Sequence, residues 1–591
     1  MLVLWQLETE RKQNLPHLGA PIESIVVSPT GSSYGIRLAD NSAMILSTSE
    51  LRPTFSIAGV QIPSAGKIDR VRLPFVPTVD APSEGTKRGQ GSRLPACISP
   101  SAGSHLLLAV PPSVSSRQAT YTSRNASYLQ TFDLGGGHQI SRQALARTNI
   151  TTLNMGPESN IIEEPNVTRI QTSYDGQWLS TVDEWMPPKR DVEPLAFDQD
   201  RVIEEQIFRR EIHLKFWSWN DNTKVWELVS RVDNPHSPQS GNPYDQGRVL
   251  DLASDPSAVG FATIGEDGTI KTWKPAIRRR NGLEVRSKDG KSLGTWHCKL
   301  TVPLESAKPI GPTSVLDAKL AYSQDGTILA AGLQSSTPCP IHIIDTYIGE
   351  VKSIQTGLYS GPLFGLGIVS KYLITLSHEL CVWDLITDQR QYGIQLHSYG
   401  LSPAKQSSMT HLTTDAEDGL FAVAVPEIGT GANAATAMKS RIAVFDPANP
   451  APLLLTPLPN PVKHLLSATK KKAFHIIDFA AEIRTVAPRQ IVSSLPTALV
   501  AKTEQASRGL RDIFGSGQTT KALENGVDKH VGLLTSRFDS ITRDTPVHED
   551  DAVVVSQDKL AEVFDVGPAY AMPPVTDLFE QVASLYNGRA S

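Results

Sequence analysis

The stretch Val259-Gly-Phe-Ala-Thr-Ile-Gly-Glu-Asp-Gly-Thr-Ile-Lys-Thr-Trp273 holds the most complete hairpin of the chain. Two apolar segments flank a turn that ends in Asp267-Gly268, and the second segment finishes on Trp273. Asp-Gly turns favour hairpins because their positive φ angles match the twist of paired strands. The stretch therefore predicts two short antiparallel strands.

The same unit recurs along most of the 591 residues. Ser173-Tyr-Asp-Gly176 and Ser323-Gln-Asp-Gly326 repeat the turn, while Leu380-Cys-Val-Trp-Asp384 and Ile442-Ala-Val-Phe-Asp446 repeat the aromatic ending. Many short strands with regular turns indicate an all-β propeller or sandwich. The tryptophan-aspartate ending favours a WD-repeat β-propeller.

Eight candidate units divide the region from residue 15 to residue 490, and they begin near Ile22, Leu94, Val167, Val249, Val315, Leu363, Thr410 and Val462. Their spacing is uneven, and the extra residues fall at 63–91, 110–125, 187–210 and 278–293. These stretches are polar or rich in Pro and Gly, so we interpret them as insertions in surface loops, which a rigid propeller tolerates. The sequence predicts seven or eight blades.

The first residues pose a separate question. Residues 1–7 look like the final strand of a blade whose earlier strands are absent. Such a strand either closes the ring by completing the last blade, near Phe474–Asp478, or ends an upstream propeller that is missing from this sequence.

Beyond residue 490 the repeat pattern stops. We expect a partly disordered linker over 491–552 and a partly helical C-terminal tail over 553–591, with an amphipathic helix at 574–587. Six residues lie on one face of that helix: Val575, Leu578, Phe579, Val582, Leu585 and Tyr586. The helix either packs on the propeller or occupies a partner's groove.

No motif in the sequence supports catalysis or metal binding. Gly31-Ser-Ser-Tyr-Gly35 matches the nucleophile elbow of hydrolases but lacks the strand, turn and helix that this motif needs. His378-Glu379 is followed by Val382 where a zinc protease needs its second histidine. The four cysteines are widely spaced, which argues against a zinc site. We expect no enzyme and no cofactor, although sequence cannot show whether acids converge in a propeller channel.

Basic clusters are the remaining candidates for a binding site. The net charge is -5, so any contact with RNA has to come from local patches. The clearest patches are Arg278, Arg279, Arg280 and Lys470, Lys471, Lys472. Such clusters can neutralise phosphates, or they are simply solvated loops.

Several segments resemble one family beyond the general repeat pattern. They are Leu4-Trp-Gln-Leu-Glu-Thr9, Leu15-Pro-His-Leu-Gly-Ala-Pro-Ile22, Val26-Val-Ser-Pro29, Leu38-Ala-Asp-Asn-Ser42, Leu214-Lys-Phe-Trp217, Val232-Asp-Asn-Pro-His236, Val555-Ser-Gln-Asp-Lys-Leu-Ala-Glu-Val-Phe564 and Pro573-Pro574. The chain resembles the WD-repeat subunit of the UtpA (t-UTP) subcomplex of the small-subunit processome.

The resemblance implies a tandem pair of propellers, of which this chain matches the second and the tail. That favours a missing upstream propeller over ring closure by residues 1–7. It also implies a non-enzymatic nucleolar scaffold of the 90S pre-ribosome, with other UtpA subunits, the 5′ external transcribed spacer of pre-rRNA and the U3 small nucleolar RNP as partners. Such a scaffold acts in U3 RNP assembly, 18S rRNA maturation and transcription by RNA polymerase I.

The rival reading is an unrelated WD-repeat adaptor such as a ubiquitin-ligase substrate receptor. That class often carries a Trp-Asp-x-Arg box, and Trp383-Asp384-Leu385-Ile386 lacks the arginine.

Overall fold

The computed structural model describes residues 3–487 with gaps, the longest at 63–93, 112–124, 149–161, 237–246, 305–316 and 429–437. All secondary structure given below lies within these residues. The helices are α1 (Lys189–Val192), the 3₁₀ helix η1 (Glu193–Leu195), α2 (Gln199–Phe208) and α3 (Pro403–Met409). In the part of the chain that is described, no helix has the length and apolar character needed to span a bilayer.

Seven antiparallel sheets follow one another along the chain, each built from consecutive neighbours apart from one inserted hairpin. The first three sheets are β7 (Ala96–Ile98), β8 (His105–Val110), β9 (Tyr128–Asp133) and β10 (His138–Ala144); β11 (Asn166–Thr172), β12 (Trp178–Trp185), β13 (Glu211–Asn220) and β14 (Val225–Asp233); and β15 (Val249–Ser254), β16 (Phe261–Gly265), β17 (Thr269–Ile277) and β20 (Gly294–Pro303). The fourth and fifth are β21 (Asp317–Tyr322), β22 (Ile328–Gln334), β23 (Ile341–Asp345) and β24 (Glu350–Gln355); and β25 (Gly365–Val369), β26 (Tyr372–Leu376), β27 (Glu379–Asp384) and β28 (Gln389–Gln395). The sixth is β29 (His411–Asp415), β30 (Leu420–Ile428), β31 (Met438–Phe445) and β32 (Leu454–Leu458), and the seventh has three strands, β33 (Val462–Ser467), β34 (Phe474–Asp478) and β35 (Ile483–Val486).

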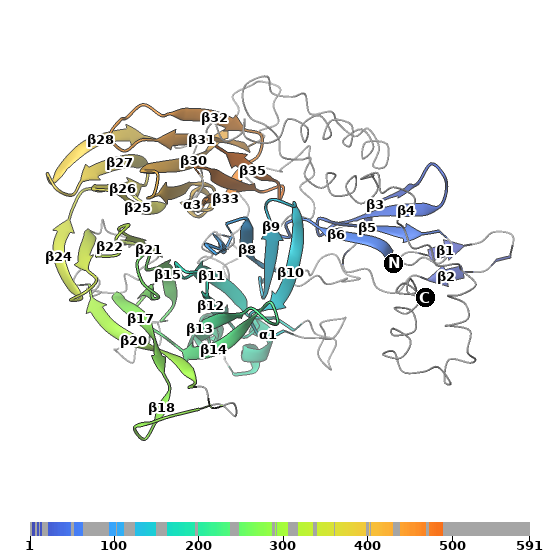
Figure 1. Cartoon of the computed structure of the whole chain (residues 1–591), viewed down its shortest axis with the longest axis horizontal. Helices are drawn as coiled ribbons and strands as arrows, with labels where there is room; N and C mark the ends of the chain where they lie inside the picture. Colours follow the sequence, from blue (N-terminus) through green and yellow to red (C-terminus); the bar gives the residue numbers. More distant parts are fainter. Residues whose placement is uncertain are drawn as a thin grey trace, which may run out of the picture. The chain divides into compact units, whose positions relative to one another are not determined.

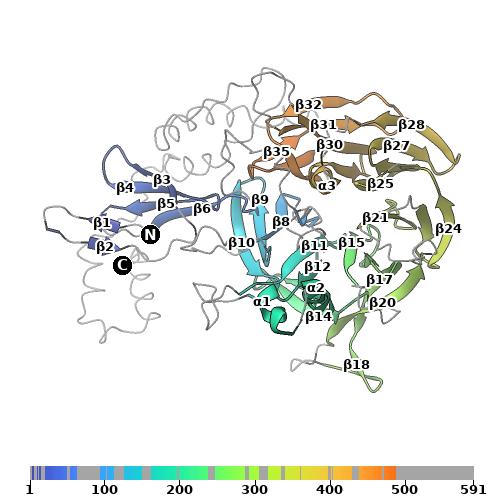
Figure 2. The same ribbon diagram turned by 180° about the vertical axis from the view of Figure 1, so that it is seen from behind.

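The first strands of these sheets surround a common centre (Figures 1 and 2). Each contacts the next in the order β7, β11, β15, β21, β25, β29 and β33, and β33 lies against β7. Leu106 of β8 and Ile477 of β34 share one buried cluster across this seam. The ring is therefore closed, which confirms the predicted all-β WD-repeat propeller.

Aromatic side chains fill the spaces between neighbouring blades. Phe216 of β13 stacks on Trp296 of β20 with ring centroids 4.3 Å apart and the planes 4° from parallel. Both rings are almost fully buried. Burying an aromatic ring removes a large apolar area from water, so contacts of this kind hold one sheet against the next.

A further sheet, with four strands, precedes the ring: β3 (Ile22–Val27), β4 (Ser33–Leu38), β5 (Ser42–Ser47) and β6 (Pro53–Ala58). It has the strand order of a blade and a small core of its own, which contains Ile36, Leu38 and Leu46. However, most residues of β3 are exposed, whereas the equivalent strand β21 is largely buried. The first of the eight predicted units, which begins at Ile22, is thus a blade-like sheet outside the closed ring.

The N-terminal strand forms a separate hairpin. β1 (Val3–Trp5) pairs with β2 (Lys12–Asn14), with Val3 opposite Asn14. Among the described strand pairings, β1 does not pair with the sheet β33–β35, so this strand does not complete the last blade there.

The predicted loop insertion at 187–210 is helical instead. It forms α1, η1 and α2 between β12 and β13. Val192 and Val202 are buried, and the Gln206 side chain donates a hydrogen bond to the Pro187 carbonyl at 2.8 Å. Helices satisfy their own backbone groups, which lets this insertion bury apolar side chains that an irregular loop would leave exposed.

Candidate nucleic-acid interface

The most distinctive surface feature is a hairpin that extends the third blade of the ring. β17 and β20 pair as far as Ile277 opposite Gly294, and the chain between them, residues 278–293, continues outward as what we call the arm. Within the arm β18 (Arg279–Arg280) pairs with β19 (Leu283–Glu284). Backbone hydrogen bonds of 2.8–2.9 Å join Val285 to Arg278 and to Leu293. Backbone hydrogen bonds thus join the described strands of the arm, which projects from the third blade of the ring (Figure 1).

The tip of the arm is a two-residue turn. Asn281 and Gly282 have φ angles of 51° and 81° and connect Arg280 to Leu283. Two consecutive positive φ angles are typical of a type I′ turn, for which Asn-Gly is the preferred sequence. The dipeptide could have identified a hairpin here, whereas sequence analysis treated the whole stretch as a loop.

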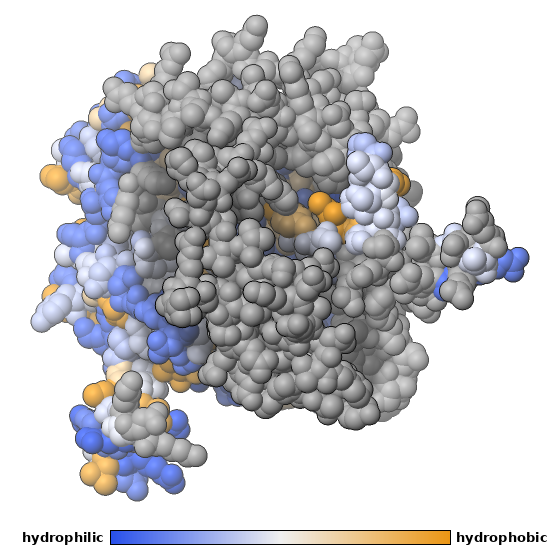
Figure 3. Space-filling view, turned by 45° about the vertical axis from the view of Figure 1, so that its right-hand side comes forward, coloured by the Kyte–Doolittle hydropathy of each residue, from blue (hydrophilic) through white to orange (hydrophobic). Residues whose placement is uncertain are grey.

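Among its described residues, the arm presents four arginines and one acidic residue, Glu284, which is opposite Arg279 in the β18–β19 pair. Arg278, Arg279 and Arg280 are exposed and form no ion pair within the described residues. Arg286, on the returning strand, lies 4.0 Å from Glu284. Leu283 beside the tip is 76% exposed. The arm is the projection at the lower edge of Figure 3, where hydrophilic and hydrophobic residues lie together.

Several other exposed basic residues differ from those of the arm because they have carboxylate partners. Arg147 lies 2.5 Å from Glu211, and Arg209 lies 3.1 Å from Glu205. Lys472, one of the predicted RNA contacts, lies 3.0 Å from Asp418. A phosphate would have to compete with these carboxylates, so such sites offer less binding energy than the arm.

The remaining candidates from the sequence cannot be placed. Lys470 and Lys471 lie outside the described residues. So do all six residues of the predicted tail helix, namely Val575, Leu578, Phe579, Val582, Leu585 and Tyr586.

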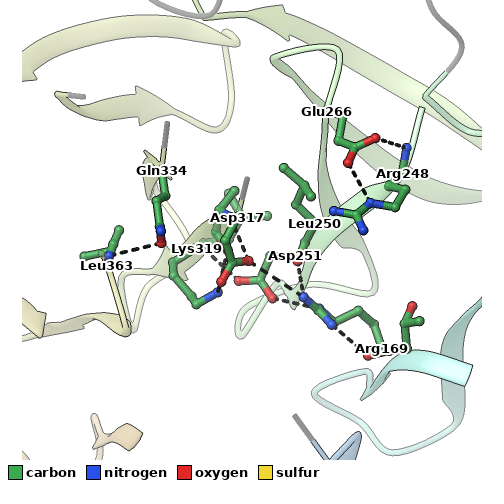
Figure 4. A network of polar contacts seen from close by, with 12 residues as sticks. Arg169, Arg248, Leu250, Asp251, Glu266, Asp317, Lys319, Gln334 and Leu363 are labelled. Atoms are coloured by element: carbon green, nitrogen blue, oxygen red, sulfur yellow. Dashed lines mark hydrogen bonds and ion pairs between the residues drawn. The ribbon is translucent and has the colours of Figure 1, made fainter. Parts of the chain in front are cut away.

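The centre of the ring carries a polar network that joins three blades (Figure 4). The guanidinium of Arg169 on β11 donates to the Leu250 carbonyl and lies 3.6 Å from Asp251 and 4.0 Å from Asp317. Lys319 completes the network at 2.7 Å from Asp317. Each charge has an opposite charge beside it, so the network binds first strands together and leaves no free charge for a ligand.

One buried group resembles a catalytic triad. His236 Nδ1 lies 3.0 Å from Asp267 Oδ1, and His236 Nε2 lies 2.8 Å from Thr263 Oγ1. Trp273 Nε1 donates to the same hydroxyl at 2.9 Å. Burial raises the pKa of Asp267, but the hydrogen bonds from His236 and Thr269 outweigh it and hold that pKa below its usual value.

This group is structural rather than reactive. His236 is fully buried, and Thr263 is also without exposed surface. A substrate cannot reach the hydroxyl, which is already hydrogen-bonded to the indole of Trp273 and to His236. Across the described residues, no cluster of three or more His, Cys, Asp or Glu side chains has an arrangement that could hold a metal ion.

Comparison with known proteins gives a consistent group of relatives, while no protein-family model matches the chain. The chain is 26% identical over 412 residues to U3 small nucleolar RNA-associated protein 17 of Schizosaccharomyces pombe, a match that covers 69% of this chain and 44% of the relative. It is 22% identical to NET1-associated nuclear protein 1 of Saccharomyces cerevisiae, over 76% of this chain and 48% of the relative. WD repeat-containing protein 75 of Xenopus laevis is 21% identical, over 68% and 39% respectively.

Two solved structures overlap with the chain. A chain of the mitotic checkpoint complex aligns with a TM-score of 0.39 and 12% identity over 70% of this chain and 98% of that one. Sqt1 of Saccharomyces cerevisiae aligns with a TM-score of 0.39 and 9% identity, over 68% and 84% respectively.

The chain spans less than half the length of the curated relatives it matches. The name of one of them, WD repeat-containing protein 75, agrees with the ring of antiparallel sheets found here. The chain is thus similar in sequence, at 21–26% identity, to U3 small nucleolar RNA-associated protein 17, NET1-associated nuclear protein 1 and WD repeat-containing protein 75.

Proposed function

We propose that this protein is a non-enzymatic scaffold of the small-subunit processome, the 90S pre-ribosome, in the nucleolus. The names of its relatives support the proposal, since one is associated with U3 small nucleolar RNA and another is a nuclear protein. In this role the protein is a UtpA subunit that contacts other UtpA subunits, the U3 RNP and the 5′ external transcribed spacer of pre-rRNA. Its loss then impairs 18S rRNA maturation, U3 RNP assembly and transcription by RNA polymerase I.

The arm is the part of the ring that we assign to the pre-rRNA. The observation that carries this assignment is the combination of a hydrogen-bonded hairpin, β18–β19, with three adjacent arginines that form no ion pair among the described residues. Arginines of this kind can contact phosphates without displacing a carboxylate, and a hydrogen-bonded hairpin loses little entropy on binding. Contacts to phosphates position a protein on RNA and do not read its sequence.

The arm assignment is tested by replacing Arg278, Arg279 and Arg280 with Gln in the full chain. Single-stranded RNA of the 5′ external transcribed spacer should bind more weakly, and the slope of log K against log salt should fall by about 2, near 0.7 per lost phosphate contact. The measurement is fluorescence anisotropy at several salt concentrations.

The matched control removes the same charge from three arginines that have carboxylate partners. These are Arg147, Arg209 and Arg231, which lie beside Glu211, Glu205 and Asp233. Equal losses of affinity in the two triple variants would show that net charge, and not the arm, governs binding.

The wider role is tested by depletion and by purification of the native complex. Depletion should reduce mature 18S rRNA and raise its precursors, as measured by northern blotting. Mass spectrometry of the purified complex should find UtpA subunits and U3 RNP proteins. If ubiquitin-ligase subunits are found in their place and 18S processing is normal, the scaffold proposal is wrong and the protein is a WD-repeat adaptor of a ubiquitin ligase.

A further inference from the structure

A cleft of about 610 Å³ lies at the base of the arm, where the third and fourth blades of the ring meet. Its walls are three turns, at residues 255–258, 325–327 and 345–347, together with lysines on the strands beside them. Lys274, in one wall, is opposite His297 in the β17–β20 pair and lies four residues before the first residue of the arm. The cleft and the arm thus share the β17–β20 strand pair.

An aromatic ring stands at the rim of this cleft. Tyr347 is 84% exposed and lies in the turn between β23 and β24. The carboxylate of Asp345 accepts backbone hydrogen bonds from Tyr347 at 2.9 Å and from Ile348 at 3.2 Å. The turn is therefore fixed while the ring of Tyr347 faces solvent. An exposed ring on a fixed turn is a platform for stacking.

The charged groups at the cleft are unevenly paired. Their formal charges balance, since Lys274, Lys299 and Lys352 face Asp255, Asp325 and Asp345. Hydrogen bonds hold two of the carboxylates in place without cancelling their charge. Asp255 accepts hydrogen bonds from Ser257, Ala258 and Lys274 at 2.8–3.1 Å, and Asp325 accepts from Ser323 and Thr327.

Lys299 is the cation that has no such partner. Its ammonium nitrogen lies 5.9 Å from the centre of the Tyr347 ring, and no carboxylate among the described residues lies within ion-pair distance of it. It sits on the exposed side of β20, five residues from Gly294. At about 3.4 Å per residue, roughly 17 Å of strand separates Lys299 from the arm.

We propose that this cleft binds a nucleotide of single-stranded RNA, with the base stacked on Tyr347 and its phosphate beside Lys299, while the RNA backbone continues along β20 to the arginines of the arm. The inference rests on the proposed contact between the arm and RNA and adds a base-binding site to it. Stacking on an aromatic ring tolerates every base, so the site adds affinity with little sequence preference. An acidic peptide would use Lys299 but would gain little from the exposed ring.

The test uses the full chain and a uridine-rich RNA of about twelve nucleotides, long enough to span the cleft and the arm. Tyr347→Ala should weaken binding about tenfold, because one stacked base is worth about 1–3 kcal/mol. Tyr347→Trp should keep or raise the affinity, and Lys299→Gln should weaken it and lower the salt slope. The control is Tyr174→Ala, which removes another exposed tyrosine, in the turn between β11 and β12.

Photo-crosslinking locates the base directly. RNA that contains 5-iodouridine should crosslink to the tryptic peptide carrying Tyr347, as identified by mass spectrometry. One outcome is that the arm variant lowers the affinity of the chain for RNA, while Tyr347→Ala and Tyr174→Ala bind RNA with the same affinity as each other. In that case the cleft inference is wrong and the arm assignment stands. If the chain binds no RNA, both are wrong. Competition by a polyglutamate peptide that matches the RNA in affinity would overturn the base site in favour of an acidic peptide.

Discussion

Thr263 joins two buried hydrogen bonds, and their directions follow from the chemistry of the groups. The indole of Trp273 can only donate, so the hydroxyl oxygen accepts from it. His236 Nδ1 faces the Asp267 carboxylate and donates to it, which leaves Nε2 to accept the hydroxyl proton of Thr263. One side chain therefore satisfies both a donor and an acceptor in the core of the third blade.

Thr263→Val tests this arrangement at constant shape. The change leaves the Trp273 N–H and His236 Nε2 buried without a partner, at about 1–3 kcal/mol each. We expect the free energy of unfolding to fall by about 2–4 kcal/mol, as measured by urea unfolding followed through tryptophan fluorescence. Thr301→Val, at an exposed position of β20, is the control and should change stability by less than about 0.5 kcal/mol. Similar losses in both variants would contradict the argument.

At the scale of elements, the sequence predicted the strands of the blades well, but it predicted the inserted segments and the contacts between blades less well. Each of the eight predicted unit starts lies within two residues of the first strand of a sheet. Turn chemistry and strand period are local, so they can be read without the fold. The partner of Lys472 could not be predicted, because Asp418 comes from the preceding sheet and only the packed ring brings the two together.

The arm should be separable from the ring. None of the described residues of 278–293 belongs to the buried cluster that contains Trp273 and Trp296. We expect that joining Ile277 to Gly294 through an Asn-Gly turn leaves the free energy of unfolding within about 0.5 kcal/mol of the parent chain. Thermal unfolding measures this directly. A loss of more than about 2 kcal/mol would mean that the arm stabilises the blade, and the arm would no longer be a site that only binding requires.

At the scale of the whole molecule, closure of the ring is the feature that sequence could not provide. The unit at Ile22 and the unit at Val462 carry the same local pattern, yet only the second lies in the ring. Which blade meets β7 depends on competing packings of similar sheets. A repeat pattern in the sequence predicts the strands of each sheet, but it does not predict which other sheet that sheet packs against.

Ile477→Ala should open the seam between the first and last blades of the ring. Ile477 is fully buried in a cluster with Leu106 and Leu108, so truncation should cost about 2–5 kcal/mol. Hydrogen exchange measured by mass spectrometry should rise in both β7–β10 and β33–β35. Ile386→Ala, at a residue 77% exposed, should change neither sheet. Faster exchange confined to β33–β35 would show that the two sheets open independently.

The seam between the first and last ring blades also affects how the chain folds during synthesis. Leu106 and Ile477 are separated by about 370 residues, a distance in sequence that makes their contact among the last to form. During synthesis, the apolar side chains at the edge of the first ring blade stay exposed to solvent until the last blade has emerged from the ribosome and can cover them. We expect nascent chains that stop before β33 to be aggregation-prone and to depend on chaperones, whereas chains that extend past β35 can close and be released.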